Sequence, residues 1–339
     1  MKISQKIKRK AVQIAAFGLS NCHVGNFFQK GGAKLYTGPW KNFCNPGLNC
    51  YSCPAASVSC PIGALQAVSG LVKMDMSFYV VGFLLAVGVL LGRFVCGFLC
   101  PFGLIQELFA KIPLPKKKLH LPRFAKYIKY GVLVVFVILM PILVTNIIGM
   151  GDPAFCQYIC PSGTLLGGIP LLGTHPELRQ TVGWLFGWKM FLAIGILAGC
   201  VLVYRFFCKT LCPLGAIYGL LNKVSFYRLT VDEEKCIHCG KCAQVCGMDV
   251  DPVKHPQSME CIRCGECAAA CPTGAIRLGF GLFRKEAGKG AVDGATADRP
   301  ADVAASDSGT APVSSGATAG SSTGCSGHCA SCSLCAGKK

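Results

Sequence analysis

Four charge-free, mostly apolar runs constrain the fold of this chain more than any other feature. The runs cover residues 11–28, 76–92, 130–151 and 190–204. The last run can be extended back to residue 181 if Lys189 is included. A helix needs about 20 apolar residues to cross ~30 Å of hydrocarbon, and each run approaches that length. Only 15% of the residues are charged, against about a quarter in a soluble domain. The sequence therefore predicts a mainly α-helical membrane protein with about four transmembrane helices.

Lysine and arginine are distributed unevenly over the segments between these runs. Residues 111–129 contain seven of them, residues 30–73 contain four, and residues 152–189 contain two. The positive-inside rule then predicts a cytoplasmic N-terminus, a cytoplasmic 111–129 loop and a cytoplasmic chain after residue 205. A cleaved signal peptide is the alternative for the first run, but no small-x-small cleavage site follows it. We expect a multi-pass protein of the inner (cytoplasmic) membrane of a prokaryote, with residues 29–75 and 149–180 facing outward.

Residues 230–280 are polar and cysteine-rich, and they contain two runs of the form CxxCxxCxxxC. This is the bacterial ferredoxin pattern, in which the fourth cysteine of each run binds the other cluster. The pattern predicts one [4Fe-4S] site made by Cys236, Cys239, Cys242 and Cys271, and a second made by Cys246, Cys261, Cys264 and Cys267. Zinc knuckles are the alternative, but zinc sites use ligands in pairs rather than in two interleaved runs of four. We expect a small α+β domain of the 2[4Fe-4S] ferredoxin type.

A Cys-Pro-x-Gly tetrad occurs five times in the chain. The tetrads begin at Cys60, Cys100, Cys160, Cys212 and Cys271, whereas random placement would give roughly 0.16. Proline suits the first helical position, so each cysteine is expected near a helix N-cap, where the helix dipole favours a thiolate. Because Cys271 belongs to a ferredoxin run, the other four cysteines are expected to be ligands as well.

Two of these tetrads end apolar runs in nearly identical sequences, RFVCGFLCPFG at 93–103 and RFFCKTLCPLG at 205–215. They indicate two repeat units, about 44–110 and 150–222, related by an axis along the membrane normal. Four thiols near that axis would form an inner-face [4Fe-4S] site: Cys96, Cys100, Cys208 and Cys212. Arg93 and Arg205 are expected to stop the helices at the membrane interface and to offset the cluster charge. The alternative is that these cysteines are small residues packed at helix ends.

The outward segments contain a second group of cysteines. An outer-face cluster is predicted at Cys53, Cys60, Cys156 and Cys160, with Cys44 and Cys50 nearby. The alternative is a redox disulfide between Cys50 and Cys53, because a CxxC pair on an oxidising face can relay thiols.

The C-terminal part has a different composition. Residues 285–324 are rich in Ala, Gly, Ser and Thr and cannot form a core, which predicts a flexible linker. A disordered, cysteine-ended tail follows at 325–339. Its four thiols could bind a metal or exchange disulfides: Cys325, Cys329, Cys332 and Cys335. The remaining organisation is a membrane domain at 1–225 and a ferredoxin domain at 230–280.

A formal charge of +18 would normally indicate anionic partners such as nucleic acid. That value omits bound thiolates, and four clusters would remove roughly eight charges. The remaining positive charge lies largely in the segments that the positive-inside rule predicts to be cytoplasmic, so no nucleic-acid partner is expected. Neither a GxGxxG nor a GxxxxGK[ST] motif is present, which argues against a nucleotide site.

Residues 76–278 resemble the NapH-type membrane ferredoxins, a group that includes the C-terminal part of NosR. The resemblance rests on the helix-terminal CxxxCP motifs at Cys96–Cys100 and Cys208–Cys212 and on the eight ferredoxin cysteines. It implies an integral electron carrier of the cytoplasmic membrane, often linked to quinol oxidation and to a reductase outside the cytoplasm. The outward CYSCP, CPIG and CQYICPSG motifs and the cysteine tail depart from NapH itself.

The expected function is electron transfer between cytoplasmic ferredoxin clusters and outer-face redox centres or a quinone pool. The chain would be an electron-transfer subunit without its own substrate chemistry, or a component of a quinol dehydrogenase. Two alternatives remain: a thiol–disulfide relay that exports reducing equivalents, and an assembly or sensing factor for a partner reductase. The expected partners are the membrane and a redox protein or quinone.

Overall fold

The computed structural model describes residues 2–28, 32–71, 78–112, 121–145, 151–180 and 182–281. The chain separates into two compact units, 1–285 and 286–339. The predicted linker and the tail cysteines Cys325, Cys329, Cys332 and Cys335 lie outside the described residues.

The N-terminal helix differs from the first predicted span. Helix α1 covers Lys2–Ser20, and short 3-10 helices η1 (Val24–Phe28) and η2 (Pro39–Asn42) follow. Polar side chains on α1, among them Arg9 and Gln13, are buried against the protein. The helix therefore starts well before residue 11 and ends before residue 28, because its basic first half is held by contacts with other helices rather than by lipid.

Two helices in the described part of the chain are long and apolar enough to cross a membrane. One is the continuous helix formed by α6 (Arg123–Val132), η3 (Leu133–Leu139) and α7 (Met140–Leu143), and the other is α10 (Trp184–Leu202). The second predicted span corresponds to α3 (Phe78–Leu91), which is apolar but shorter. The mainly helical architecture is thus confirmed, and the count of four spans is not.

The two copies of the CxxxCP motif fold alike. Each apolar helix is followed by a short turn of helix, α4 (Phe94–Phe98) or α11 (Phe206–Thr210), and then by a longer one. The longer helices are α5 (Pro101–Phe109) and α12 (Pro213–Leu221). Helix α5 packs on α10, and α12 packs on α3. Each copy therefore covers the apolar helix of the other, as a pair related by a pseudo-twofold axis would.

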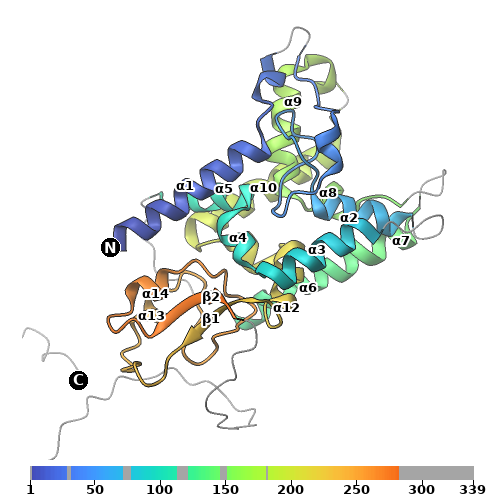
Figure 1. Cartoon of the computed structure of the whole chain (residues 1–339). Helices are drawn as coiled ribbons and strands as arrows, with labels where there is room; N and C mark the ends of the chain where they lie inside the picture. Colours follow the sequence, from blue (N-terminus) through green and yellow to red (C-terminus); the bar gives the residue numbers. More distant parts are fainter. Residues whose placement is uncertain are drawn as a thin grey trace, which may run out of the picture. The chain divides into compact units, whose positions relative to one another are not determined.

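The outward motifs also precede helices. Cys60 precedes α2 (Pro61–Gly70), which packs against α3, η3 and α7 (Figure 1). Helix α8 (Ala154–Tyr158) contains Cys156, and η4 (Gly163–Gly168), α9 (Ile169–Thr174) and η5 (Pro176–Arg179) follow.

The ferredoxin part is a small α+β unit. Strands β1 (Tyr227–Val231) and β2 (Ile276–Phe280) pair antiparallel, with Tyr227 opposite Phe280 and Val231 opposite Ile276. Helices α13 (Lys241–Gln244) and α14 (Glu266–Ala270) pack on each other beside this sheet (Figure 1). The strands bring the two ends of the domain together, so both cysteine runs lie close to one another.

Candidate iron-sulfur sites

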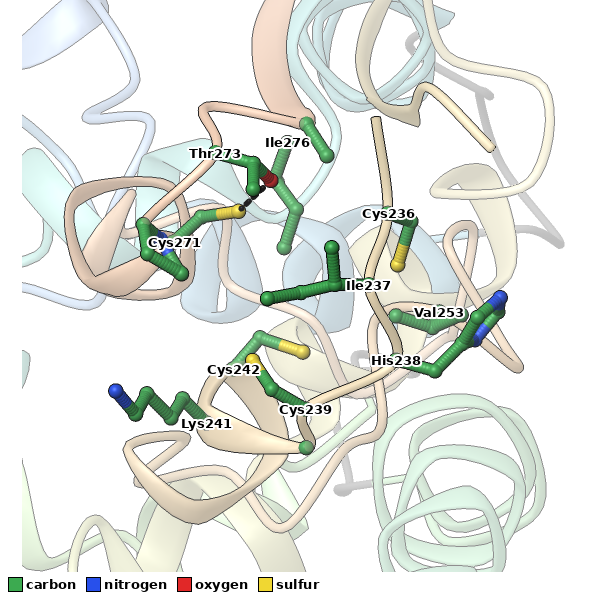
Figure 2. A pocket seen from close by; sticks show the side chains of 13 residues that line it. Cys236, Ile237, His238, Cys239, Lys241, Cys242, Val253, Cys271, Thr273 and Ile276 are labelled. Atoms are coloured by element: carbon green, nitrogen blue, oxygen red, sulfur yellow. Dashed lines mark hydrogen bonds between the residues drawn. The ribbon is translucent and has the colours of Figure 1, made fainter. Parts of the chain in front are cut away.

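The four cysteines predicted for the first ferredoxin cluster line one cavity. Cys236, Cys239, Cys242 and Cys271 surround about 350 Å³ of space, together with Ile237 and neighbouring backbone. Figure 2 shows their side chains around this space, with Cys271 and Cys236 on opposite sides and Cys239 and Cys242 below them. The interleaved set of cysteines expected from the spacing is the one that the fold brings together around this space.

The second ferredoxin set is also gathered in one place. The pKa of Cys267 is raised to about 12, first by burial and then by the nearby thiols of Cys264, Cys261 and Cys246. Thiols that oppose one another's ionisation in this way form a site that becomes favourable when a metal neutralises them.

Among the described residues, no three His, Cys, Asp or Glu side chains are placed to hold one metal ion. In a [4Fe-4S] cluster each thiolate binds a different iron atom. The four sulfurs around a cubane consequently lie farther apart than the ligands of one zinc ion. The all-thiolate donor sets suit a cluster.

The four cysteines predicted for the inner-face site are called the inner quartet below: Cys96 lies in α4, Cys208 in α11, and Cys100 and Cys212 directly precede α5 and α12. Cys96, Cys100, Cys208 and Cys212 are each at most 8% exposed, in a part of the chain that is otherwise rich in apolar side chains. Cys100 and Cys212 are N-caps with proline at the first helical position. The sulfur of Cys212 accepts a hydrogen bond from the Gly215 amide at 3.3 Å. At Cys212 an amide of the helix start thus faces the thiol, as the motif predicted, whereas the Cys100 side chain makes no such cap hydrogen bond.

The tetrad at Cys271 does not follow this rule. Cys271 is the residue that ends α14, and a turn with Gly274 in the left-handed region leads directly into β2. The prediction of a helix N-cap is wrong at this position, because the next residues pair with β1 and are not free to form a helix.

Arg93 and Arg205 were expected at the membrane interface, but both are fully buried. Each guanidinium group crosses to the opposite repeat. Arg93 Nη2 donates to the Cys208 carbonyl oxygen at 3.2 Å, and Arg205 Nη1 donates to the carbonyl oxygen of Cys96. A guanidinium group has five donors to satisfy, and carbonyls at helix ends are free to accept. The two arginines therefore join the halves of the inner quartet and place two fixed positive charges beside it.

Gln106 is a site residue that the sequence analysis missed. It is fully buried on α5; its Nε2 donates to the Cys208 sulfur at 3.1 Å, and its Oε1 accepts from the Cys208 amide at 3.4 Å. The sequence contains a signal for this residue, because a glutamine occupies the sixth position after both Cys60 and Cys100.

Glu107 provides the counter-charge of this region. Its carboxylate accepts from Arg205 Nε at 2.9 Å and from Arg9 Nη2 at 2.9 Å, and it also contacts Lys10. Burial by itself would raise the pKa of Glu107, but the charges of Arg205, Arg9 and Lys10 outweigh it and hold that pKa well below its usual range. Arg9 also pairs with Glu266 on α14 at 3.0 Å. Helix α1 therefore connects the inner site to the ferredoxin part.

The loop that carries Cys261 and Cys264 contacts the inner site directly. A Cβ atom on Gly97 would lie only 2.7 Å from the Ile262 carbonyl oxygen, so only glycine permits this approach. Arg93 Nη1 donates to the Met259 carbonyl oxygen at 2.7 Å and to the Glu260 carboxylate at 2.9 Å. One arginine thus contacts both a ligand residue of the inner quartet and the residues just before Cys261.

The outward cysteines are arranged differently from the prediction. The pKa of Cys160 is raised first by burial and then by the nearby thiols of Cys156, Cys50 and Cys60. Cys53, which was expected in this group, lies instead in a small cluster with Ala55 and Ala56. The structure therefore groups Cys50 with Cys60, Cys156 and Cys160, and Cys50 also packs against the cluster that contains Cys53.

Comparison with known families agrees with this chemistry. One family, described as a 4Fe-4S binding domain, matches residues 75–122, 132–174 and 184–229. Another with the same description matches residues 229–250 and 258–277. The outward segment with Cys50 and Cys60 lies outside both matches.

Several curated proteins are similar to this chain. An uncharacterized protein of Methanocaldococcus jannaschii is 28% identical over 208 residues, which cover 58% of this chain and 68% of that protein. The putative electron transport protein YccM of Escherichia coli is 26% identical over 48% of this chain and 43% of its own length. The ferredoxin-type protein NapH of Haemophilus influenzae is 28% identical over 47% of this chain and 48% of its own length.

The chain thus spans about half the length of YccM and NapH. No solved structure matches it. The family matches cover both copies of the CxxxCP motif and both ferredoxin runs. The similarity to NapH covers 47% of this chain. The chain carries 4Fe-4S binding domains in its CxxxCP part and in its ferredoxin part and is similar to ferredoxin-type electron transport proteins, in agreement with its resemblance to the NapH/NosR-type family.

Proposed function

We propose that this protein conducts electrons between cytoplasmic ferredoxin clusters and an inner intramembrane cluster, and from there to an outer-face centre or a quinone pool. The observation that carries the proposal is the contact between the Cys261–Cys264 loop and Gly97. It joins a predicted ferredoxin site to the inner quartet through backbone, with no space for a side chain between them.

The ion pairs around this contact hold the two sites at a fixed separation. Arg93 is fully buried and binds Cys208 on one side and Met259 and Glu260 on the other. Arg9 makes a second link between Glu107 and Glu266. Charged side chains that pair inside the protein favour one geometry over others. A fixed geometry suits electron transfer, whose rate falls steeply with distance.

The residues at the inner quartet would hold a cluster in a dry, positively charged environment. A [4Fe-4S] cluster there would accept and release one electron at a time. The burial of all four cysteines excludes water, while Arg93 and Arg205 place positive charge near the thiolates. Gln106 donates a hydrogen bond to one ligand sulfur, which favours the more negative state.

The membrane arrangement forms part of the same proposal. The helix Phe124–Leu143 and helix α10 would cross the bilayer, and the basic segments would keep the ferredoxin part in the cytoplasm. The membrane domain at 1–225 and the ferredoxin domain at 230–280 would then hold the redox centres of one electron-transfer path. The partners would be a soluble redox protein on one side and a quinone or an extracytoplasmic redox protein on the other.

Iron and sulfide analysis of the full-length protein, purified without oxygen, tests the inner site. Removing ligands with Cys96→Ser plus Cys208→Ser is expected to lower the content by about four iron atoms per chain. Cys44→Ser is the matched control, because Cys44 is equally buried but is not part of the inner quartet. An unchanged iron content in the double variant would contradict the proposal.

Electron transfer itself can be followed in liposomes that contain the full chain. A low-potential donor is supplied on the ferredoxin side, and a quinone analogue or an impermeant acceptor is supplied as the electron sink. Reduction of the sink is expected with the wild type and with Cys44→Ser. The double variant is expected to lose it while its ferredoxin clusters are still reduced.

A further inference from the structure

The outward cysteines form a group whose surroundings copy those of the inner quartet. We propose that Cys50, Cys60, Cys156 and Cys160 bind a further [4Fe-4S] cluster, with Gln66 as its hydrogen-bond donor. The inference rests on the proposed electron-transfer function and deepens it, because it supplies a redox centre at the other end of the helices. Two of these ligands, Cys50 and Cys60, come from a segment outside every family match.

The first argument is the approach of thiols from two distant segments. A Cβ atom on Gly63 would lie 3.9 Å from the Cys156 sulfur, and one on Gly163 would lie 4.0 Å from the Cys50 sulfur. Gly63 follows Cys60 by three residues, and Gly163 follows Cys160 by three. The glycine of each tetrad therefore faces a thiol of the other segment, and Cys50 occupies the place in one half that Cys156 occupies in the other.

The second argument is the glutamine. Gln66 is fully buried on α2; its Nε2 donates to the Cys156 sulfur at 3.2 Å, and its Oε1 accepts from the Phe155 amide at 2.8 Å. At the inner site, Gln106 makes the same pair of bonds to the Cys208 sulfur and the Cys208 amide. Both glutamines follow their Cys-Pro-x-Gly tetrad at the same distance. A buried amide that donates to a ligand sulfur is a feature shared by the two sites.

The third argument is burial. Cys60 and Cys160 are each 7% exposed, and Cys50 and Cys156 are half-buried. A neutral thiol group gains little from three neighbouring thiols in such a place, whereas a bound cluster neutralises the thiolates and uses all four.

Cys53 is the matched control within this segment. It is as buried as Cys60, but it packs with Ala55 and Ala56, near the backbone amides of the turn that follows Cys50. A substitution at Cys53 therefore changes a buried thiol in the same loop without removing a proposed ligand.

The experiment compares Cys50→Ser and Cys53→Ser in the full-length protein, purified without oxygen. Cys50→Ser is expected to lower the iron and acid-labile sulfide content by about four atoms each, and Cys53→Ser is expected to leave both unchanged. Because a serine oxygen can sometimes replace a thiolate, Gln66→Leu provides a second measurement. It is expected to keep the iron content and to shift the midpoint potential of one cluster signal, and this signal differs from the one that Gln106→Leu shifts.

Several outcomes would overturn the inference and leave the proposed function intact. One is an unchanged iron content in Cys50→Ser, with no potential shift in Gln66→Leu, when Cys96→Ser plus Cys208→Ser still loses four iron atoms. Another is a Cys50–Cys53 disulfide found by mass spectrometry in the cluster-loaded protein, which would indicate a thiol relay. If the Cys96 and Cys208 substitutions also leave the iron content unchanged, the proposed function itself fails.

Discussion

Replacing Glu107 with glutamine tests whether the buried ion network holds the inner site together. The Glu107 side chain is 2% exposed and that of its partner Arg205 is 0% exposed, so neither charge is compensated by water. Glu107→Gln keeps the size of the side chain but removes the charge that faces Arg205, Arg9 and Lys10. Removing one partner of a buried pair typically costs about 3–5 kcal/mol, because the remaining charge stays buried without its counter-ion.

For a protein of this size, about 1 kcal/mol corresponds to roughly 2–4 °C in the unfolding midpoint. We therefore expect Glu107→Gln to lower the midpoint by on the order of 10 °C. Circular dichroism of the detergent-solubilised, cluster-loaded protein would measure it. Asp232→Asn is the control, since Asp232 pairs with Lys235 on the surface and its loss is expected to change nothing measurable. A midpoint within about 2 °C of the wild type would refute the reasoning, because it would mean that water or a cluster already compensates Arg205.

Two further predictions concern the inner site and its link to the ferredoxin part. Gln106→Leu is expected to lower the midpoint potential of one cluster by about 40 mV, because it removes a hydrogen bond to a ligand sulfur that favours the reduced state by about 1 kcal/mol. Redox titration followed by electron paramagnetic resonance measures this potential. An unchanged potential would contradict the role of the Gln106 amide. Gly97→Ala is expected to slow electron transfer between the ferredoxin part and the inner site at unchanged iron content, because a Cβ atom would meet the Ile262 carbonyl oxygen at 2.7 Å. Rapid mixing with a low-potential donor measures this rate. Gly82→Ala is the control, since its Cβ atom would meet nothing within 4 Å, and equal rates in both variants would be evidence against the contact.

Much of the local structure could be predicted from the chain. Within the apolar runs at 130–151 and 190–204, helices extend as far as Leu143 and Leu202, and Cys60, Cys100 and Cys212 are N-caps followed by proline. These features depend on residues within one or two turns of each other. The first helix was predicted less well, because its position depends on the partners of Arg9 and Gln13 on other helices.

The same division applies to the candidate sites. Spacing within each ferredoxin run was enough to group Cys236, Cys239 and Cys242, which lie around one cavity with Cys271. Spacing could not choose between Cys50 and Cys53, which are three residues apart in one turn. Cys50 lies close to Cys160 in a distant segment, whereas Cys53 packs with Ala55 and Ala56 in its own turn.

The sequence by itself determined where apolar helices form, which cysteines begin helices and which belong to ferredoxin runs, because backbone preferences and short spacings act within a few residues. Only the tertiary structure decided which groups meet across the repeat. Gln66 reaches a thiol 90 positions away, Gln106 reaches one 102 positions away, and Arg205 pairs with a carboxylate 98 positions away. Such contacts depend on how two copies of a motif pack against each other, and no local pattern encodes that packing.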